Sequence, residues 1–139
     1  MSKITLIKIS IVFLIGIMTS CNENNVKITG LNSTEFYQNH LHLLEEGNAL
    51  VIDGRTRQMY ESGHLQHAIN IDADDANLYD LLRQHADEPL IVVYCTTNRR
   101  TGKIVNTLST FYEGEVIYID DGIRGWQANG LPLSGFSGF

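Results

Sequence analysis

The sequence predicts an α/β domain with a central parallel sheet and helices on both faces. Short apolar runs such as residues 90–94 lack alternating polar positions, as expected of strands that are buried on both faces. Segments with helical spacing separate these runs, which is the order found in parallel sheets. The chain has 139 residues, 43% of them hydrophobic and 19% charged, which suits a single globular domain.

Helices and strands alternate along the predicted domain. The first helix begins at Asn32, which can cap it with Glu35 three residues later, and it ends near Gly47. Further helices are expected at residues 57–62, 77–85, 100–112 and 123–128, and strands at 49–52, 68–71, 90–94 and 116–119. Ligands of such sheets bind beyond the carboxyl ends of the strands. Cys95 follows the strand at 90–94 directly and therefore lies at a candidate binding position.

The first twenty residues form a separate segment. Lys3 and Lys8 precede an apolar run from Ile9 to Met18, which is too short to span a membrane and is typical of a secretory signal. Cys21 follows soon after this run, and the order resembles a bacterial lipobox, in which the cysteine is acylated and becomes the new N-terminus. We therefore expect residues 1–20 to be a lipoprotein signal peptide. An uncleaved N-terminal anchor helix is the alternative.

This interpretation divides the chain into three parts and predicts its location. Residues 1–20 are the signal peptide, residues 21–31 a polar tether that starts at the lipidated Cys21, and residues 32–139 the folded domain. The protein is then exported and anchored to a membrane, either in the periplasm or at the surface of a bacterial cell. Because the domain is acidic, the lipid rather than surface charge must hold it at the membrane.

The charge pattern argues against nucleic acid as a partner. The formal net charge is −6, and the chain has no Lys/Arg-rich run interleaved with aromatic residues. A polyanion would gain little from counterion release on such a surface. The sequence does not indicate a protein partner, and we expect neither a cofactor nor a metal ion.

Cys95 is the main candidate for a catalytic residue. If Cys21 carries lipid, Cys95 has no cysteine partner in its own chain and is either a buried, inert thiol or a reactive one. The amides of a loop that enters a helix can converge on an anion, and Arg99 and Arg100 add positive charge there. These features favour thiolate over thiol at Cys95. The predicted substrate-binding residues are Thr96, Thr97, Asn98, Arg99 and Arg100. We also expect Asn98 to supply a left-handed residue in this tight loop.

Four segments in the same order resemble the rhodanese-like family. They are Asp53-Gly54-Arg55, the run from Gly63-His64 to Asn70, the loop from Cys95 to Arg100, and the run from Gly122 through Trp126 to Leu131-Pro132. The resemblance extends from about residue 30 to residue 133. Three departures occur: Thr96 stands where many active members have arginine, Asn98 replaces the loop glycine, and Asp121 replaces the first of two glycines.

The resemblance implies a single rhodanese-like domain with sulfurtransferase activity. Cys95 would take a sulfane sulfur from thiosulfate or another small donor, carry it as a persulfide, and pass it to a thiol or a cyanide-like acceptor. Asp53 and Arg55 are expected to form a buried pair that supports the loop, and His64 is expected to make local hydrogen bonds. We expect Trp126 to belong to the core.

Two other functions remain open. A phosphatase or arsenate reductase also holds its oxyanion in a cysteine loop, but such loops have five residues between cysteine and arginine, whereas Cys95 and Arg100 have four between them. The shorter loop fits a persulfide better. A non-catalytic binding module with the same fold is the second alternative, and Thr96 and Asn98 are the residues that keep it open.

Overall fold

The computed structural model describes residues 25–135 as one α/β domain with a five-stranded sheet. The strands are β1 (Lys27–Leu31), β2 (Leu50–Asp53), β3 (Ile69–Asn70), β4 (Leu90–Tyr94) and β5 (Glu115–Ile119). All neighbouring strands are parallel, in the order β1-β5-β4-β2-β3. The predicted fold class is confirmed. The predicted signal peptide and Cys21 lie outside the described residues.

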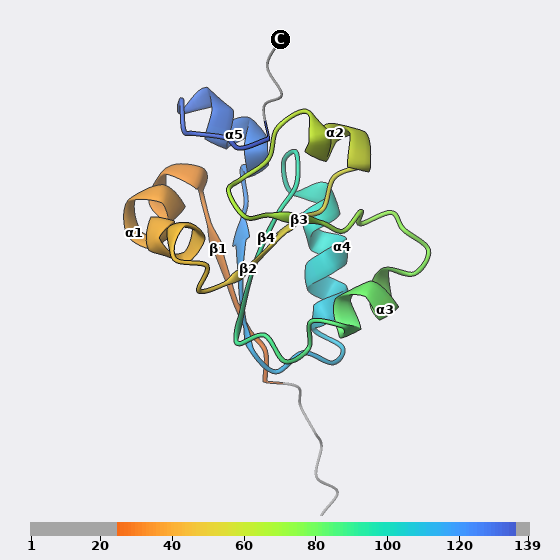
Figure 1. Ribbon diagram of the computed structural model, residues 1–139. Coiled ribbons are helices and arrows are strands. Elements are labelled where there is room, and N and C mark those ends of the chain that lie inside the picture. The colour runs from red at the N-terminus through yellow and green to blue at the C-terminus, as the bar shows by residue number, and fades with distance from the viewer. Residues whose placement is uncertain (1–24, 136–139) are drawn as a thin grey trace, which may run out of the picture.

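Helices cover both faces of this sheet. They are α1 (Ser33–Glu45), α2 (Arg57–Glu61), α3 (Leu78–Arg83), α4 (Arg99–Leu108) and α5 (Gly122–Ala128). Figure 1 shows α1 and α5 on one face and α3 and α4 on the other. The Asn32 side chain accepts a hydrogen bond from the Glu35 amide, so the predicted cap of α1 is confirmed. Helix α4 is shorter than expected and ends at Leu108 rather than near residue 112.

Strand β1 corrects the predicted boundary between tether and domain. Residues 21–31 were expected to form a tether, but Lys27–Leu31 pairs with β5 along its whole length, with Lys27 opposite Glu115. None of its five residues is buried, and Ile28 is 42% exposed, because β1 lies at the edge of the sheet. The strand therefore lacks the continuous apolar run by which the other strands were predicted. The folded domain begins at or before Lys27.

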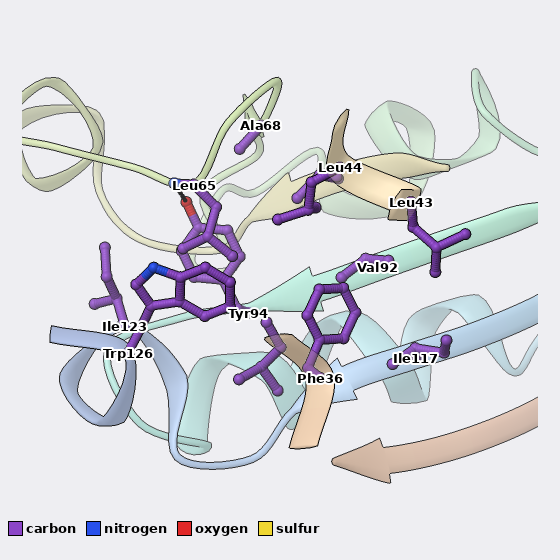
Figure 2. Close-up of a cluster of buried hydrophobic side chains, with 12 residues drawn as sticks. Phe36, Leu43, Leu44, Leu65, Ala68, Val92, Tyr94, Ile117, Ile123 and Trp126 are labelled. Carbon is purple, nitrogen blue, oxygen red and sulfur yellow. Dashed lines mark hydrogen bonds between the residues drawn. The ribbon is translucent and has the colours of Figure 1, made fainter. Parts of the chain in front are cut away.

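Two clusters of apolar side chains form the core, one on each face of the sheet. The first joins α1 and α5 to the sheet through Phe36, Tyr94 and Trp126, which are at most 1% exposed (Figure 2). The Trp126 indole also donates a hydrogen bond to the Pro132 carbonyl at 2.8 Å, which confirms the core position expected for it. The second cluster packs α3 and α4 against the opposite face and includes Leu82 and Ile104. Burial on both faces explains why β4 is apolar throughout and why β5 is apolar after Glu115.

Across residues 25–135, no helix combines the length and the hydropathy needed to cross a membrane.

Candidate active site

Cys95 lies where the sequence predicted, directly after β4 and before α4. Its side chain is 2% exposed, and it is a free cysteine. Within the described residues, none of the six amide N–H groups from Thr96 to Thr101 donates a hydrogen bond. The last three belong to the first turn of α4, where the helix offers no acceptors. The loop after Cys95 therefore holds a series of unused donors, as an anion-binding loop requires.

The N-terminus of α5 fixes the direction of the first two of these amides. The Ile123 amide donates to the Cys95 carbonyl at 2.9 Å, and the Arg124 amide donates to the Thr96 carbonyl at 3.2 Å. In a trans peptide the N–H points opposite to the C=O, and the described residues contain no cis bond. The amides of Thr96 and Thr97 consequently point away from α5 and remain open to a ligand.

Close contact between the loop and α5 depends on Gly122. Its φ is +59°, and a Cβ at this position would lie 2.5 Å from the Cys95 carbonyl oxygen and 2.6 Å from that of Thr97. Asn98, by contrast, has a φ of −131°, so the expectation that it is left-handed is wrong. The left-handed residue of this region is instead Gly122, the first residue of α5. The chain turns sharply there, which brings the first amides of α5 against the Cys95 loop.

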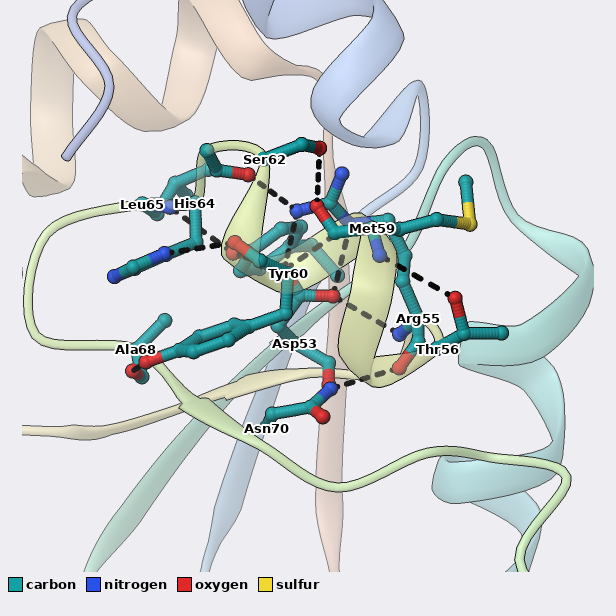
Figure 3. Close-up of polar contacts among 12 residues, drawn as sticks. Asp53, Arg55, Thr56, Met59, Tyr60, Ser62, His64, Leu65, Ala68 and Asn70 are labelled. Carbon is teal, nitrogen blue, oxygen red and sulfur yellow. Dashed lines mark hydrogen bonds and ion pairs between the residues drawn. The ribbon is translucent and has the colours of Figure 1, made fainter. Parts of the chain in front are cut away.

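Asp53 and Arg55 form the buried ion pair that the sequence predicted. The carboxylate of Asp53 is 0% exposed and lies 2.6 Å from the Arg55 Nη2 atom (Figure 3). The same Nη2 atom donates to the Gly63 carbonyl at 2.6 Å. Burial acts to lower the pKa of Arg55, but the hydrogen bonds and charge of Asp53 outweigh it, and the pKa is raised.

Tyr94 connects this pair to the residue before Cys95. Its hydroxyl donates to the Asp53 carboxylate at 2.7 Å and accepts a hydrogen bond from the Leu65 amide at 3.0 Å. Burial and the charge of Asp53 both raise the pKa of Tyr94, so the hydroxyl stays protonated and keeps its role as donor. The network thereby holds the end of β4, and with it the start of the Cys95 loop, against the segment that follows α2.

The two loop arginines have different surroundings. Arg100 Nε donates to the Asp74 carboxylate at 2.9 Å, and Lys103 pairs with the other oxygen of the same carboxylate. The hydrogen bond that Arg100 donates to Asp74 is the main reason why the pKa of Arg100 is raised, and the charge of Cys95 contributes in the same direction. Arg99 is exposed, with no ion-pair partner among the described residues. Arg100 is thus the cation that is fixed near the thiol.

The structure brings the other predicted loop residues together around Cys95 but exposes them unequally. Thr97 and Asn98 are exposed. Thr96 is half-buried, and its buried hydroxyl has no hydrogen-bond partner among the described residues.

Two residues that support the site were not predicted as such. Asp74 was missed because it lies in the segment between β3 and α3, outside the four segments that resemble the family. Asp121 was noted only as a departure from the family pattern. Its carboxylate accepts hydrogen bonds from the Ser33 amide at 2.8 Å and from the Ser33 hydroxyl at 2.7 Å, which joins the start of α5 to the start of α1.

His64 makes the local contacts that the sequence predicted. Its Nδ1 atom lies 3.0 Å from the Tyr60 carbonyl, and its ring stacks on that of Tyr60 at 3.9 Å. In the part of the chain that the structure describes, no three His, Cys, Asp or Glu side chains are grouped in a way that could hold a metal ion.

The fold and the loop define an α/β domain that presents a cysteine among unused backbone amides. The family model of the Rhodanese-like domain matches residues 37–129, and the chain belongs to that family. The resemblance that the motifs indicated is therefore confirmed.

The matches to similar proteins cover very different shares of those proteins. The tRNA uridine(34) hydroxylase of Salmonella typhimurium is 34% identical over 100 residues, and the match covers 66% of this chain but only 28% of the hydroxylase. A solved rhodanese-related protein from Thermoplasma volcanium has a TM-score of 0.62 at 21% identity, covering 77% of this chain and 98% of that one. A thiosulfate sulfurtransferase from Pseudomonas aeruginosa has a TM-score of 0.60 at 22% identity, with 77% of this chain and 20% of that one covered. At these identities the two structures show the fold alone.

Proposed function

We propose that the protein is a sulfurtransferase that carries sulfane sulfur as a persulfide on Cys95. The observation that supports this most directly is the buried thiol followed by six amides with no acceptor. Amide donors stabilise a terminal sulfur anion, and the fixed charge of Arg100 favours both the thiolate and an anionic donor. Membership of the rhodanese-like family supports sulfurtransferase chemistry in the same position.

The reaction can be written with thiosulfate as donor. The Cys95 thiolate attacks the outer sulfur of thiosulfate, a new S–S bond forms, the S–S bond of thiosulfate breaks, and sulfite leaves with the bonding electron pair. An acceptor such as cyanide then attacks the outer sulfur of the persulfide. Thiocyanate forms, and Cys95 departs as thiolate, ready for the next cycle. No net oxidation of the protein occurs over the two steps.

Mass spectrometry of the purified domain after exposure to thiosulfate tests this proposal. We expect a gain of one sulfur atom on Cys95 that is lost again when cyanide is added. Cys95→Ser should abolish both changes while the fold remains intact, because the substitution removes the sulfur but little volume. If the parent protein gains no sulfur from thiosulfate or from a polysulfide, the non-catalytic binding module becomes the better description.

An aryl phosphate is the control substrate. Only four residues separate Cys95 from Arg100, and the Arg100 side chain is held by Asp74, so we expect no turnover of a phosphate ester. Hydrolysis of such an ester at a rate comparable to sulfur transfer would contradict the assignment.

We also propose that the domain is exported and lipid-anchored at Cys21. The apolar run that ends shortly before this cysteine supports the proposal. Metabolic labelling with a palmitate analogue should mark the parent protein, whereas Cys21→Ala should remain unlabelled and unprocessed. Equal labelling of the two proteins would argue against a lipoprotein.

A further inference from the structure

Two arginines beside the Cys95 loop have no anionic partner. Residues 25–135 contain eight lysines and arginines. Five of these cations form ion pairs with acidic side chains, namely Lys27, Arg55, Arg57, Arg100 and Lys103. Arg83 forms none, but its Cζ atom lies 5.0 Å from the centre of the Phe111 ring. Arg99 and Arg124 are exposed, and among the described residues neither has an acidic or an aromatic partner.

Unpaired cations are unexpected in this chain, because its acidic residues outnumber its lysines and arginines by 16 to 10. The acids of the site are already engaged: the carboxylate of Asp74 binds two other cations, and that of Asp121 is bound by Ser33. Arg99 and Arg124 therefore add positive potential that no side chain of the described domain neutralises. An anion from solution would gain by binding there.

Both arginines lie at the start of a helix that adjoins the Cys95 loop. Arg99 is the first residue of α4, and Arg124 is the third residue of α5. The Arg124 amide donates to the Thr96 carbonyl at 3.2 Å, so the start of α5 lies against the loop (Figure 1). Because side chains on a helix lean towards its N-terminus, both side chains extend to the side on which the loop lies. We call Arg99 and Arg124 the rim arginines.

The rim arginines lie farther out than the groups that surround the transferred sulfur. The Cys95 thiol is buried, and the loop amides and Arg100 are the donors beside it, whereas the two rim arginines are exposed. A molecule that reacts at the buried sulfur must insert its own sulfur atom and leave the rest of its body at the rim. Arginine binds carboxylates through two parallel hydrogen bonds. The rim therefore complements a body that carries carboxylates.

We propose that Arg99 and Arg124 bind the sulfur acceptor, and that the acceptor is a small thiol with carboxylates on its body. The inference rests on the sulfurtransferase function proposed above. Thiosulfate is a compact anion, and the loop amides together with Arg100 supply the donors that it needs. The rim arginines are thus left for the second substrate, which approaches when the persulfide already occupies the loop.

The transfer step balances with such an acceptor. The acceptor thiol loses its proton to solvent, its sulfur attacks the outer sulfur of the Cys95 persulfide, and the bond between that sulfur and Cys95 Sγ breaks. The acceptor leaves as a persulfide, and Cys95 returns to the thiolate. The rim arginines take no part in bond making and act by holding the carboxylates.

Single-turnover discharge of the Cys95 persulfide tests the rim. The full chain is loaded with thiosulfate, and mass spectrometry follows its discharge by mercaptosuccinate, which has two carboxylates, or by thioglycerol, which has none. Arg99→Gln and Arg124→Gln should each lower the ratio of the mercaptosuccinate rate to the thioglycerol rate by about threefold, as expected for one exposed ion pair. The double variant should lower it by about tenfold. General effects on the reactivity of the persulfide cancel in this ratio.

The matched control is Arg83→Gln, which removes the same charge from an exposed arginine. Arg83 packs on Phe111, which lies beyond the C-terminal end of α4 and thus at the far end of that helix from the loop. This variant should keep the ratio of the parent protein. An unchanged ratio in the double variant, or an equal fall in Arg83→Gln, would overturn the proposal. Slower loading by thiosulfate with an unchanged discharge ratio would assign the rim to the donor and would also overturn it.

Alkylation separates failure of this proposal from failure of the sulfurtransferase function, because it requires no persulfide. Iodoacetate carries a carboxylate, and iodoacetamide has nearly the same shape without the charge. The ratio of their rates at Cys95, measured on the peptide that contains it, should fall in the double variant but not in Arg83→Gln. A fall in this ratio without any persulfide on Cys95 would refute both the sulfurtransferase and the acceptor role. A persulfide that forms while neither ratio falls would refute the rim site alone.

Discussion

The carboxylate of Asp53 depends on its neighbours, because it is 0% exposed and cannot be hydrated. Arg55 supplies hydrogen bonds from its side chain and its backbone amide, and Tyr94 supplies another from its hydroxyl. A buried charge of this kind is tolerated only when all its partners are present. The position of Cys95 next to Tyr94 makes the site sensitive to this one carboxylate.

Arg55→Met should therefore destabilise the domain by about 3–5 kcal/mol, because it leaves the Asp53 charge buried without its cation. Urea unfolding measures the difference. The matched control is Arg57→Met, which removes an exposed cation paired with Glu61 and should leave the unfolding midpoint nearly unchanged. Similar losses in the two variants would mean that the buried pair has no special role.

The sequence identified some residues of the site but not others. Cys95 and the pair of Asp53 and Arg55 were identified because each lies at the end of an apolar strand within a recognisable motif. Asp74 was not identified, because its role depends on contacts with Arg100 and Lys103, which are distant in the sequence. Such properties have no periodicity that a sequence could display.

Helix α5 acts on the active-site loop through its first turn. Its amides bind the carbonyls of Cys95 and Thr96, and Gly122 allows the two segments to approach. The sequence predicted the helix, but it did not predict the contact between α5 and the Cys95 loop. Gly122 was interpreted only as part of a C-terminal motif. A left-handed φ in the residue that opens α5 explains why glycine is needed there.

Gly122→Ala should destabilise the domain and slow persulfide formation at Cys95. The left-handed conformation alone costs an alanine roughly 1–2 kcal/mol, and the contact with the Cys95 carbonyl adds to that cost. Gly130→Ala is the control, because Gly130 has a φ of +65° but a Cβ there meets nothing within 4 Å. The melting temperature and the rate at which thiosulfate loads Cys95 with sulfur are measured for both variants. Equal effects on loading would show that the close approach of α5 is unimportant.

Edge strands are harder to predict than central ones, and β1 illustrates the reason. The strand Lys27-Ile28-Thr29-Gly30-Leu31 buries little on either face, so no continuous apolar run marks it. The central strands β4 and β5 are covered by helices on both sides and could be located from their composition alone.

At the scale of the whole domain, the ion pairs of Asp74 join the segment before α3 to the first turns of α4. Hydrogen bonds from Lys103 and then from Arg100 lower the pKa of Asp74 to about 2. In the unfolded chain its pKa should be close to the usual 3.9. A lowered native pKa means that the pair stabilises the fold above about pH 4 and that this contribution is lost as the pH falls towards 2.

Asp74→Asn should consequently lower the melting temperature near neutral pH and by much less at pH 2, where about half of the Asp74 carboxylates of the parent are already protonated. Thermal unfolding followed by circular dichroism between pH 2 and pH 6 measures the difference between the two proteins. Because Asp74 is partly exposed, added salt should reduce that difference. A difference that stays constant down to pH 2 would mean that the charge of Asp74 is not responsible.

The pairing of β1 with β5 has a consequence for the order in which the chain can fold. Lys27 lies opposite Glu115, so within residues 25–135 β1 pairs only with a strand that lies 88 residues later, and Ser33 contacts Asp121 across the same separation. During synthesis β1 stays unpaired until β5 has been made. Contacts of such long range slow closure of the fold. The sheet therefore cannot be completed at this edge until β5 has been made, and such a delay would suit the export that we propose, because the first strand stays unpaired in the meantime.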